Sequence, residues 1–181
     1  MSALFINRMI LVLLLVAGLA VAGCQESPQG MPKADAVAVM MPLGESGVQG
    51  VVAFAKGSEG VRVTATFSNL APGLHGFHIH EYGDCRTSDG ASAGGHFNPN
   101  NQIHGGPDSE QRHVGDLGNV QADEKGIARA DFSLKTLSLS GDEGIIGRSV
   151  VLTEHQDDFR TQPTGNAGAR LACGVIGFAH R

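Results

Sequence analysis

Short runs of apolar or alternating residues recur along most of the chain, and they predict β-strands. Turns that contain Gly, Pro or Asn separate the runs, as at residues 71–73 and 140–142. Short strands with frequent turn signals indicate an antiparallel β-sandwich or barrel, and no window has the period of a long amphipathic helix. The predicted strands are residues 36–40, 50–55, 61–67, 76–80, 127–134, 149–153 and 173–178.

Two longer segments, Gly83–Leu117 and Asp157–Ala169, fit no strand pattern. Loops of this length are uncommon in a compact domain and are usually functional. Most of the histidines lie in or beside the first segment. We therefore expect the functional site to involve these two loops.

The amino-terminal residues predict an export signal. The uncharged apolar run Met9–Ala22 follows Arg8 and precedes Gly23 and Cys24, as in a secretory signal peptide. It is short for a membrane span, which needs about 20 apolar residues. The tetrad Val21-Ala22-Gly23-Cys24 resembles the bacterial lipobox, which predicts cleavage before Cys24 and lipid modification of that cysteine. The alternative is an ordinary signal peptide with an incidental cysteine.

These features divide the chain into three parts. Residues 1–23 are the predicted lipoprotein signal peptide, and residues 24–35 are a polar tether that contains Pro28, Gly30 and Pro32. Residues 36–181 have the size of one folded domain. Because Gln25, rather than Asp, follows Cys24, the lipobox resemblance gives no inner-membrane retention signal. We expect a periplasmic protein with its lipid anchor in the outer membrane.

Composition and charge narrow the functional classes. The chain has 18 acidic and 13 basic residues, with a net charge of −5, which argues against a basic nucleic-acid-binding protein. Apolar residues make up 41% of the chain, which argues against intrinsic disorder. Apart from Cys24, the cysteines are Cys85 and Cys173. Export permits a disulfide between them, and two free thiols are the alternative.

The histidines are the strongest chemical signal. His78 and His80 lie two residues apart in a predicted strand, so their rings project from the same face. Alone, such a pair is weak evidence for a metal site. Five of the eight histidines, however, fall within 36 residues.

A second group of candidate ligands follows this pair. His96, His104, His113 and Asp116 are spaced by 8, 9 and 3 residues. Three imidazoles and one carboxylate make a plausible closed, tetrahedral zinc site, and a bound metal can order a loop that has little core of its own. The alternative is a set of unrelated surface histidines.

Several stretches of the chain resemble the copper–zinc superoxide dismutase family. The similarity runs from about Val37 to His180, and the motifs occur in the family's order. The resemblance implies a Greek-key antiparallel β-sandwich or flattened barrel with two long functional loops. It also implies copper and zinc as cofactors and superoxide as the substrate. The motifs are GFHIHE at 76–81, GGHFNP at 94–99, HGGP at 104–107, RHVGDLGN at 112–119 and GNAGARLACG at 165–174.

The resemblance also assigns roles to the candidate ligands. It implies that His78 and His80 bind copper and that His96 bridges copper and zinc through its two ring nitrogens. The zinc ligands that it implies, together with His96, are His104, His113 and Asp116.

Four further residues match family positions. Arg170 would lie beside the copper channel and attract superoxide, because a guanidinium stays charged and hydrogen-bonds a small anion. Asp157 would link a copper histidine to a zinc histidine, which fixes ring orientation. Cys85 and Cys173 match the family's intrasubunit disulfide, and the position of Cys85 resembles the bacterial branch.

The chain departs from the family at one copper ligand. The stretches 145–148 and 157–158 match the family motif with unchanged spacing, and this places Thr153 in the slot of the fourth copper histidine. Thr is a poor copper ligand. His155 lies two residues later, and a shift in the following turn would bring it to copper as a substitute. The alternative is a solvent-facing loop histidine, which leaves three copper ligands.

Two functions follow from this departure. The first is an enzyme that dismutates superoxide to oxygen and hydrogen peroxide, which the presence of Arg170 and Asp157 favours. The alternative is a non-catalytic or weakly active protein that binds zinc and copper, which Thr153 favours. The expected partners are superoxide and, through Cys24, a membrane lipid. A homodimer is the candidate assembly, and no nucleic acid is expected.

Overall fold

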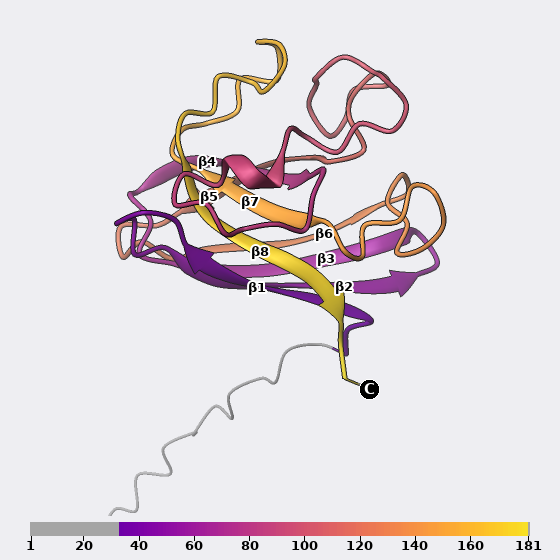
Figure 1. The fold of residues 1–181 in the computed structure, drawn as a ribbon, viewed down its shortest axis with the longest axis horizontal. Helices are drawn as coiled ribbons and strands as arrows, with labels where there is room; N and C mark the ends of the chain where they lie inside the picture. Colours follow the sequence, from indigo (N-terminus) through magenta and orange to yellow (C-terminus); the bar gives the residue numbers. More distant parts are fainter. Residues whose placement is uncertain (1–32, 181) are drawn as a thin grey trace, which may run out of the picture. The chain divides into compact units, whose positions relative to one another are not determined.

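Eight strands in the described part of the chain close into an antiparallel barrel (Figure 1). The computed structural model describes residues 33–180. Around the barrel the order is β1-β2-β3-β6-β5-β4-β7-β8, and pairing of β8 with β1 closes the ring. The strands are β1 Ala36–Pro42, β2 Gln49–Gly57, β3 Gly60–Ser68, β4 Gly73–His80, β5 Asp116–Ala122, β6 Ala128–Leu134, β7 Ser149–Thr153 and β8 Arg170–Phe178.

Side chains from alternate strand positions fill the interior of the barrel. In β3, every second residue is buried, and Val61, Val63 and Phe67 lie in the core. Phe67 and Phe77 pack edge to face with ring centroids 5.4 Å apart, a favourable geometry for an aromatic pair. The period-2 pattern of the sequence therefore corresponds to an inner and an outer face of the barrel.

β4 and β7 differ from the other strands because both of their faces are buried. Residues 75–80 of β4 and all five residues of β7 are shielded from solvent. Phe77 and Ile79 point into the core, so His78 and His80 lie on the outer face. A strand that is buried on both faces must be covered from outside. The two long loops supply this cover.

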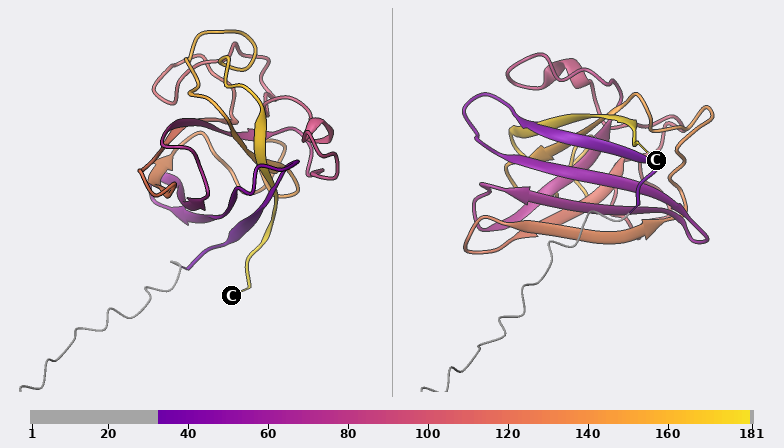
Figure 2. Two further views of the ribbon diagram at one scale, coloured as in Figure 1. Left: turned by 90° about the vertical axis from the view of Figure 1, so that its left-hand side faces the viewer. Right: turned by 90° about the horizontal axis from the view of Figure 1, so that it is seen from below.

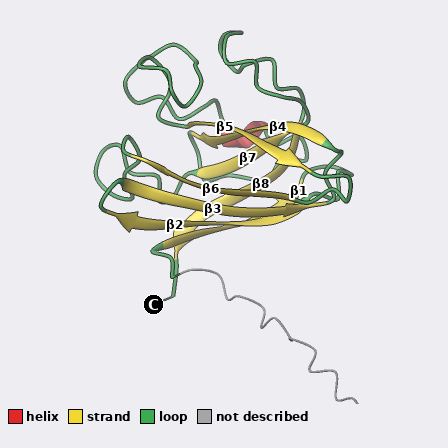
Figure 3. Cartoon of the chain, turned by 180° about the vertical axis from the view of Figure 1, so that it is seen from behind, coloured by secondary structure: helices red, strands yellow, loops and turns green. Residues whose placement is uncertain are grey.

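The long loops extend from the same side of the barrel. In Figure 1 the loop after β4 and the loop between β7 and β8 both rise above β4 and β7. The left view of Figure 2 shows the ring of strands nearly end-on with both loops above it, and Figure 3 shows that they have almost no regular structure. The first loop contains one short 3₁₀ helix, η1, at Ala91–Ala93.

The structure confirms the predicted all-β fold and adds a strand, β5, that the sequence pattern did not predict. The predicted loop Gly83–Leu117 ends earlier, because β5 begins at Asp116 and pairs with β4. The sequence pattern did not reveal this strand, because its third residue is Gly118, with a left-handed φ of 97°. Its pairing with β4 is also irregular, with a register shift between Phe77 and His78. Gly, unlike other residues, adopts such a φ without strain.

The predicted signal peptide, the lipid site Cys24 and the tether up to residue 32 lie outside the described residues. Between residues 33 and 180, no helix is long and apolar enough to cross a membrane.

Candidate metal centre

His78 and His80 project from the outer face of β4 into the space under the loops. His78 lies opposite Val151 of β7, and His80 lies opposite Ser149. Both imidazole rings are almost completely buried. The strand thus places two adjacent nitrogen donors where solvent is excluded, as the two-residue spacing predicts.

Hydrogen bonds fix the tautomer of each of these two rings. His78 Nε2 lies 2.8 Å from Asp157 Oδ2, and His80 Nδ1 lies 3.0 Å from the carbonyl oxygen of Gly94. Both partners accept protons, so each of these nitrogens carries its ring's N–H. The other nitrogens, His78 Nδ1 and His80 Nε2, are buried and have no hydrogen-bond partner. Unprotonated buried nitrogens without a partner are suited to bind a metal ion.

The second group of predicted ligands converges on one carboxylate. The Nδ1 atoms of His96, His104 and His113 lie 2.8, 3.1 and 3.2 Å from Asp116 Oδ1. All four ligand atoms lie within 4.8 Å of one another. Zinc binds nitrogen and oxygen at about 2.0–2.2 Å, so tetrahedral ligand atoms stand roughly 3.3 Å apart. The donor set and its spacing therefore fit a zinc ion.

His96 lies between the two groups of ligands. Its ring stacks on His78 with centroids 4.0 Å apart and meets His80 at 5.1 Å. On the other side its ring lies 5.3 Å from His104 and 5.5 Å from His113. Since Nδ1 faces Asp116, Nε2 is the nitrogen left for the side of His78 and His80. The ring of His96 thus occupies the place between the two groups that a bridging imidazole would take.

Asp157 links the two groups of histidines from the second long loop. Its Oδ2 lies 2.8 Å from His78 Nε2, and its Oδ1 lies 2.9 Å from His104 Nε2. Gly165 approaches this contact so closely that a Cβ there would stand 2.7 Å from His104 Nε2. The structure thus brings Asp157 to the position between two histidines that the resemblance implies.

The electrostatics of the centre favour a cation. Burial would raise the pKa of Asp116, but hydrogen bonds with His104, His113 and His96 outweigh it and hold that pKa far below its usual range. Burial would lower the pKa of His104, but hydrogen bonds and charge from Asp116 and Asp157 raise it to about 9. Two ionised, buried carboxylates therefore surround the histidines, and they would attract a metal cation as they attract a proton.

Burial outweighs the opposing interactions at the two rings nearest the β4 side. Desolvation lowers the pKa of His96 to about 4, although the hydrogen bond with Asp116 acts to raise it. Desolvation and the neighbouring charges of His96 and Arg170 hold the pKa of His80 well below its usual range. Both rings are therefore neutral at pH 7, which is the form that binds a metal.

Arg170 lies beside His80 because both side chains donate to the same carbonyl. Arg170 Nη2 lies 2.7 Å from the oxygen of Gly94, which His80 Nδ1 also contacts, and Nη1 donates to Gly90. The guanidinium is half-buried between the loop and β8. The structure thus places a fixed positive charge next to the candidate copper ligand His80.

Thr153 lies on the outer face of β7, the side of the sheet on which His78 and His80 project from β4, but it offers no imidazole. Its hydroxyl donates to the carbonyl oxygen of Gly76 over 3.1 Å and is buried. A Cβ on Gly76 would approach Thr153 Oγ1 at 2.5 Å and His78 Cε1 at 2.9 Å. Thr153 therefore occupies the wall of the site next to His78.

His155 is not brought into the buried cluster. β7 ends at Thr153, after a register shift in its pairing with β8, and the side chain of His155 is 63% exposed. Its Nε2 lies 3.7 Å from Glu154 Oε2, and its ring packs beside Gly168. Among the described residues, no ring contact joins His155 to the other histidines.

The predicted disulfide is present. Cys85, in the loop after β4, is bonded to Cys173 on β8 with Cα atoms 5.7 Å apart. This bond ties the first long loop to the barrel at a point close to Arg170. It confirms the pairing that the resemblance implies.

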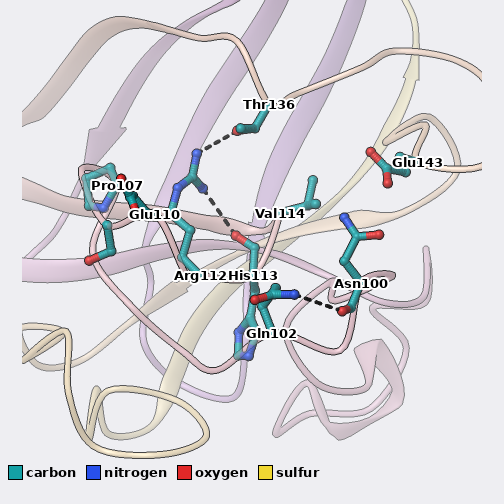
Figure 4. A pocket seen from close by; sticks show the side chains of 10 residues that line it. Asn100, Gln102, Pro107, Glu110, Arg112, His113, Val114, Thr136 and Glu143 are labelled. Carbon is teal, nitrogen blue, oxygen red and sulfur yellow. Dashed lines mark hydrogen bonds between the residues drawn. The ribbon is translucent and has the colours of Figure 1, made fainter.

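A polar cavity of about 560 Å³ lies beside His113 on the outer side of the centre. Figure 4 shows Arg112 reaching across it to Thr136 and to the main chain of His113. Arg112 also donates to the carbonyl oxygen of Asp116 over 3.1 Å. The Arg112 side chain therefore holds the backbone of two candidate ligands, His113 and Asp116. Arg112 belongs to the motif at 112–119, but the sequence did not indicate this role.

Comparisons with known proteins agree with this geometry. Residues 48–176 match the family described as copper/zinc superoxide dismutase (SODC). Superoxide dismutase [Cu-Zn] A of Xenopus laevis is 49% identical over 148 residues, which cover 78% of this chain and 97% of that protein. The superoxide dismutase [Cu-Zn] of Saccharomyces cerevisiae is 46% identical over 152 residues and covers 79% and 98%. An extracellular superoxide dismutase [Cu-Zn] of Onchocerca volvulus is 42% identical over 153 residues and covers 78% and 76%.

Proposed function

The chain belongs to the copper/zinc superoxide dismutase family, and from this premise we propose that its buried centre dismutates superoxide with copper and zinc. Two superoxide anions and two protons give one molecule of oxygen and one of hydrogen peroxide. The observation that carries the proposal is the position of His96, whose ring contacts His78 and His80 on one side and His104 and His113 on the other.

The two groups of donors divide between the metals. His78 Nδ1, His80 Nε2 and His96 Nε2 would hold copper, which when bound exchanges single electrons with superoxide. Zinc would be held by His96 Nδ1, His104 Nδ1, His113 Nδ1 and Asp116 Oδ1. The buried nitrogens without partners on His78 and His80 support this division.

Residues around the donors orient them and guide the substrate. Asp157 fixes the rings of His78 and His104 at once. Arg170, held by two carbonyl oxygens, attracts the anionic substrate to the copper side, which matters because the chain as a whole is negative. A local positive charge can concentrate a small anion despite an unfavourable net charge. His96 Nε2 is the atom at which the chain can carry a proton to the product.

The second candidate function is a zinc-stabilised protein that binds copper without efficient catalysis. Thr153 favours it, because its hydroxyl is hydrogen-bonded to Gly76 and supplies no nitrogen donor. The exposed position of His155 leaves the loop in need of rearrangement before this ring could substitute. The dismutase remains the leading proposal, since Arg170 is not needed merely to hold zinc and Asp157 also holds the ring of His78 on the copper side.

Metal content and dismutase activity of the copper- and zinc-loaded protein decide between the two functions. The leading proposal predicts one copper per chain and removal of superoxide well above the metal-free protein. Substoichiometric copper without activity would establish the second function.

If the wild type lacks copper and activity, Thr153→His should restore both. A loss of activity in His155→Ala would show that His155 substitutes as a ligand, and unchanged activity would remove that idea.

We also propose that the protein is exported and lipid-anchored in the periplasm, at the outer membrane. The apolar run before Cys24 and the lipobox-like tetrad support this proposal, and so does the Cys85–Cys173 disulfide, because disulfides are typical of exported proteins. One of the relatives is named as extracellular. Release of a Cys24→Ala variant from the membrane fraction is expected, together with an acyl mass on Cys24 of the wild type. Unchanged fractionation without that mass would contradict the anchor.

A homodimer is the assembly that we propose. Val39 and Met41 of β1 and Val175 of β8 are exposed apolar side chains on the outer face of two neighbouring strands. Apolar groups gathered in this way often mark a protein interface.

A further inference from the structure

The loop between β7 and β8 holds the main chain of His104 as well as its ring. The side-chain amide of Gln162 contacts both polar backbone groups of that residue. Gln162 Oε1 accepts from the His104 N–H over 2.8 Å, and Gln162 Nε2 donates to the His104 carbonyl oxygen over 2.9 Å. One side chain thus makes the pair of hydrogen bonds that a neighbouring strand would make.

The turn that carries Gln162 is built to hold it in place. Asp158 Oδ1 accepts from the N–H groups of Arg160 and Thr161, and Oδ2 accepts from the Thr161 hydroxyl. Gly165 donates to the carbonyl oxygen of Thr161 over 2.6 Å. A turn with its backbone groups satisfied in this way presents its next side chain in a defined direction.

A second amide holds the other partner of His104 in the same manner. Asn119 Nδ2 donates to the carbonyl oxygen of Asp157 over 3.0 Å, and the Asp157 N–H donates to Asn119 Oδ1 over 2.8 Å. The contact between Asp157 Oδ1 and His104 Nε2, 2.9 Å long, is therefore braced at the main chain of both residues. Neither long loop can shift alone without breaking one of these amide pairs.

We propose that Gln162 is a positioning residue that couples the loop between β7 and β8 to the zinc ligand His104, so that zinc leaves only when this amide pair opens. The inference rests on the proposed zinc site. Residues that orient metal ligands commonly change metal affinity by roughly 10–100-fold when they are replaced. Gln162 reaches the ligand's backbone rather than its ring, so it controls where the ring stands and not how basic the ring is.

Release of zinc to a chelator, measured on the whole chain, tests this inference. In Gln162→Leu, zinc release is expected to be roughly tenfold faster than in the wild type. Gln102→Leu is the matched control: Gln102 lies in the same loop as His104, and its side-chain amide donates to the carbonyl oxygen of Asn100 over 3.2 Å. That control should release zinc at the wild-type rate.

Hydrogen exchange at the His104 amide, followed by NMR, separates positioning from general destabilisation. Exchange at this amide should accelerate in Gln162→Leu while the amides of the β3 core keep their protection. Gln162→Glu retains an acceptor for the His104 N–H, so it should restore protection of that amide.

The outcomes distinguish this inference from the proposed function. Zinc retained by the wild type but released equally fast by Gln162→Leu and Gln102→Leu would overturn the inference alone. Unchanged exchange at the His104 amide in Gln162→Leu would also overturn it. A wild-type protein that retains no zinc would overturn the proposed function and the inference together.

Discussion

At the scale of single residues, the centre depends on which ring nitrogens carry protons. Asp157 and Gly94 accept from one nitrogen of His78 and His80 respectively, and this leaves His78 Nδ1 and His80 Nε2 buried and free of partners. Orphaned buried polar atoms are rare in proteins and call for an explanation. A metal ion on the side that faces His96 supplies one.

The position of His96 predicts that its loss affects both metals. In His96→Ala we expect the affinity for copper and for zinc each to fall by at least roughly tenfold, since even residues behind the ligands have effects of that size. His80→Ala should lose copper alone, and His113→Ala should lose zinc more than copper. Metal content after dialysis against a weak chelator provides the measurement. Loss of a single metal in His96→Ala would contradict the bridge.

The sequence predicted the ligands better than the contacts that hold them. The two-residue spacing of His78 and His80 follows from strand geometry, and the motifs supplied the remaining ligands. Gln162 was missed because its hydrogen bonds join residues 58 positions apart, and no local pattern encodes such a contact. The sequence left open whether His155 is a substitute ligand or a solvent-facing loop histidine, because the answer depends on where β7 ends.

At the scale of elements, β4 and β7 are set apart by burial of both faces. Their inner faces were predictable from alternating apolar residues, and their outer faces were not, because the loops that cover them have no strand pattern. β5 was missed for a related reason: its first residue, Asp116, is a candidate metal ligand and its third is the left-handed Gly118. Local propensity fails where a functional group interrupts an element.

The disulfide is expected to stabilise the loop against the barrel. Cys85 and Cys173 are separated by 88 residues, and removal of a disulfide that closes a long loop typically costs about 2–5 kcal/mol of unfolding free energy. Urea unfolding of Cys85→Ala should show a loss in this range. Treatment with a reductant should lower the stability of the wild type to that of the variant and leave the variant unchanged. A variant as stable as the oxidised wild type would contradict this role.

The exposed pair between β3 and β6 gives a pH-dependent prediction. Arg62 contacts both carboxylate oxygens of Asp131 at 2.7 and 2.6 Å, and this hydrogen bond and the charge of Arg62 lower the pKa of Asp131. A carboxyl whose pKa is lower in the folded than in the unfolded state stabilises the fold above its unfolded pKa, near 3.9, and loses that effect as the pH falls through the folded value.

We therefore expect Asp131→Asn to have a slightly lower Tm than the wild type at pH 7, with a difference that shrinks below about pH 4. Both side chains are more than half exposed, so the difference should be small and should decrease with added salt. Circular dichroism melting curves from pH 7 to pH 3 provide the test. A constant difference over this range would show that the charge of Asp131 is not the cause.

At the scale of the whole molecule, a closed barrel carries the metal centre on its outer surface, under loops, rather than in its interior. The apolar core fills the barrel and keeps β4 rigid, while the disulfide, Asp157 and Arg170 connect the loops to the strands. Rigid elements hold a site more accurately than loops alone. This arrangement explains how long loops rich in glycine can position metal ligands.

The exposed apolar side chains of β1 and β8 predict self-association. Val39, Met41 and Val175 are 58%, 60% and 45% exposed, and β1 pairs with β8. Light scattering of the purified chain should give the mass of a dimer, and the double variant Val39→Lys/Val175→Lys should give the mass of a monomer with the same strand content. A wild type that remains monomeric at concentrations on the order of 100 μM would contradict the homodimer, because stable interfaces of standard size bind far more tightly than this.

Anomalous diffraction at the copper and zinc edges, from crystals of the metal-loaded protein, tests the two-metal centre most directly. We expect two separate peaks on opposite sides of His96. The zinc peak should lie about 2.0–2.2 Å from His96 Nδ1 and from Asp116, His104 and His113, and the copper peak should contact His78 Nδ1 and His80 Nε2. A single peak, or copper bound away from His78 and His80, would contradict the account.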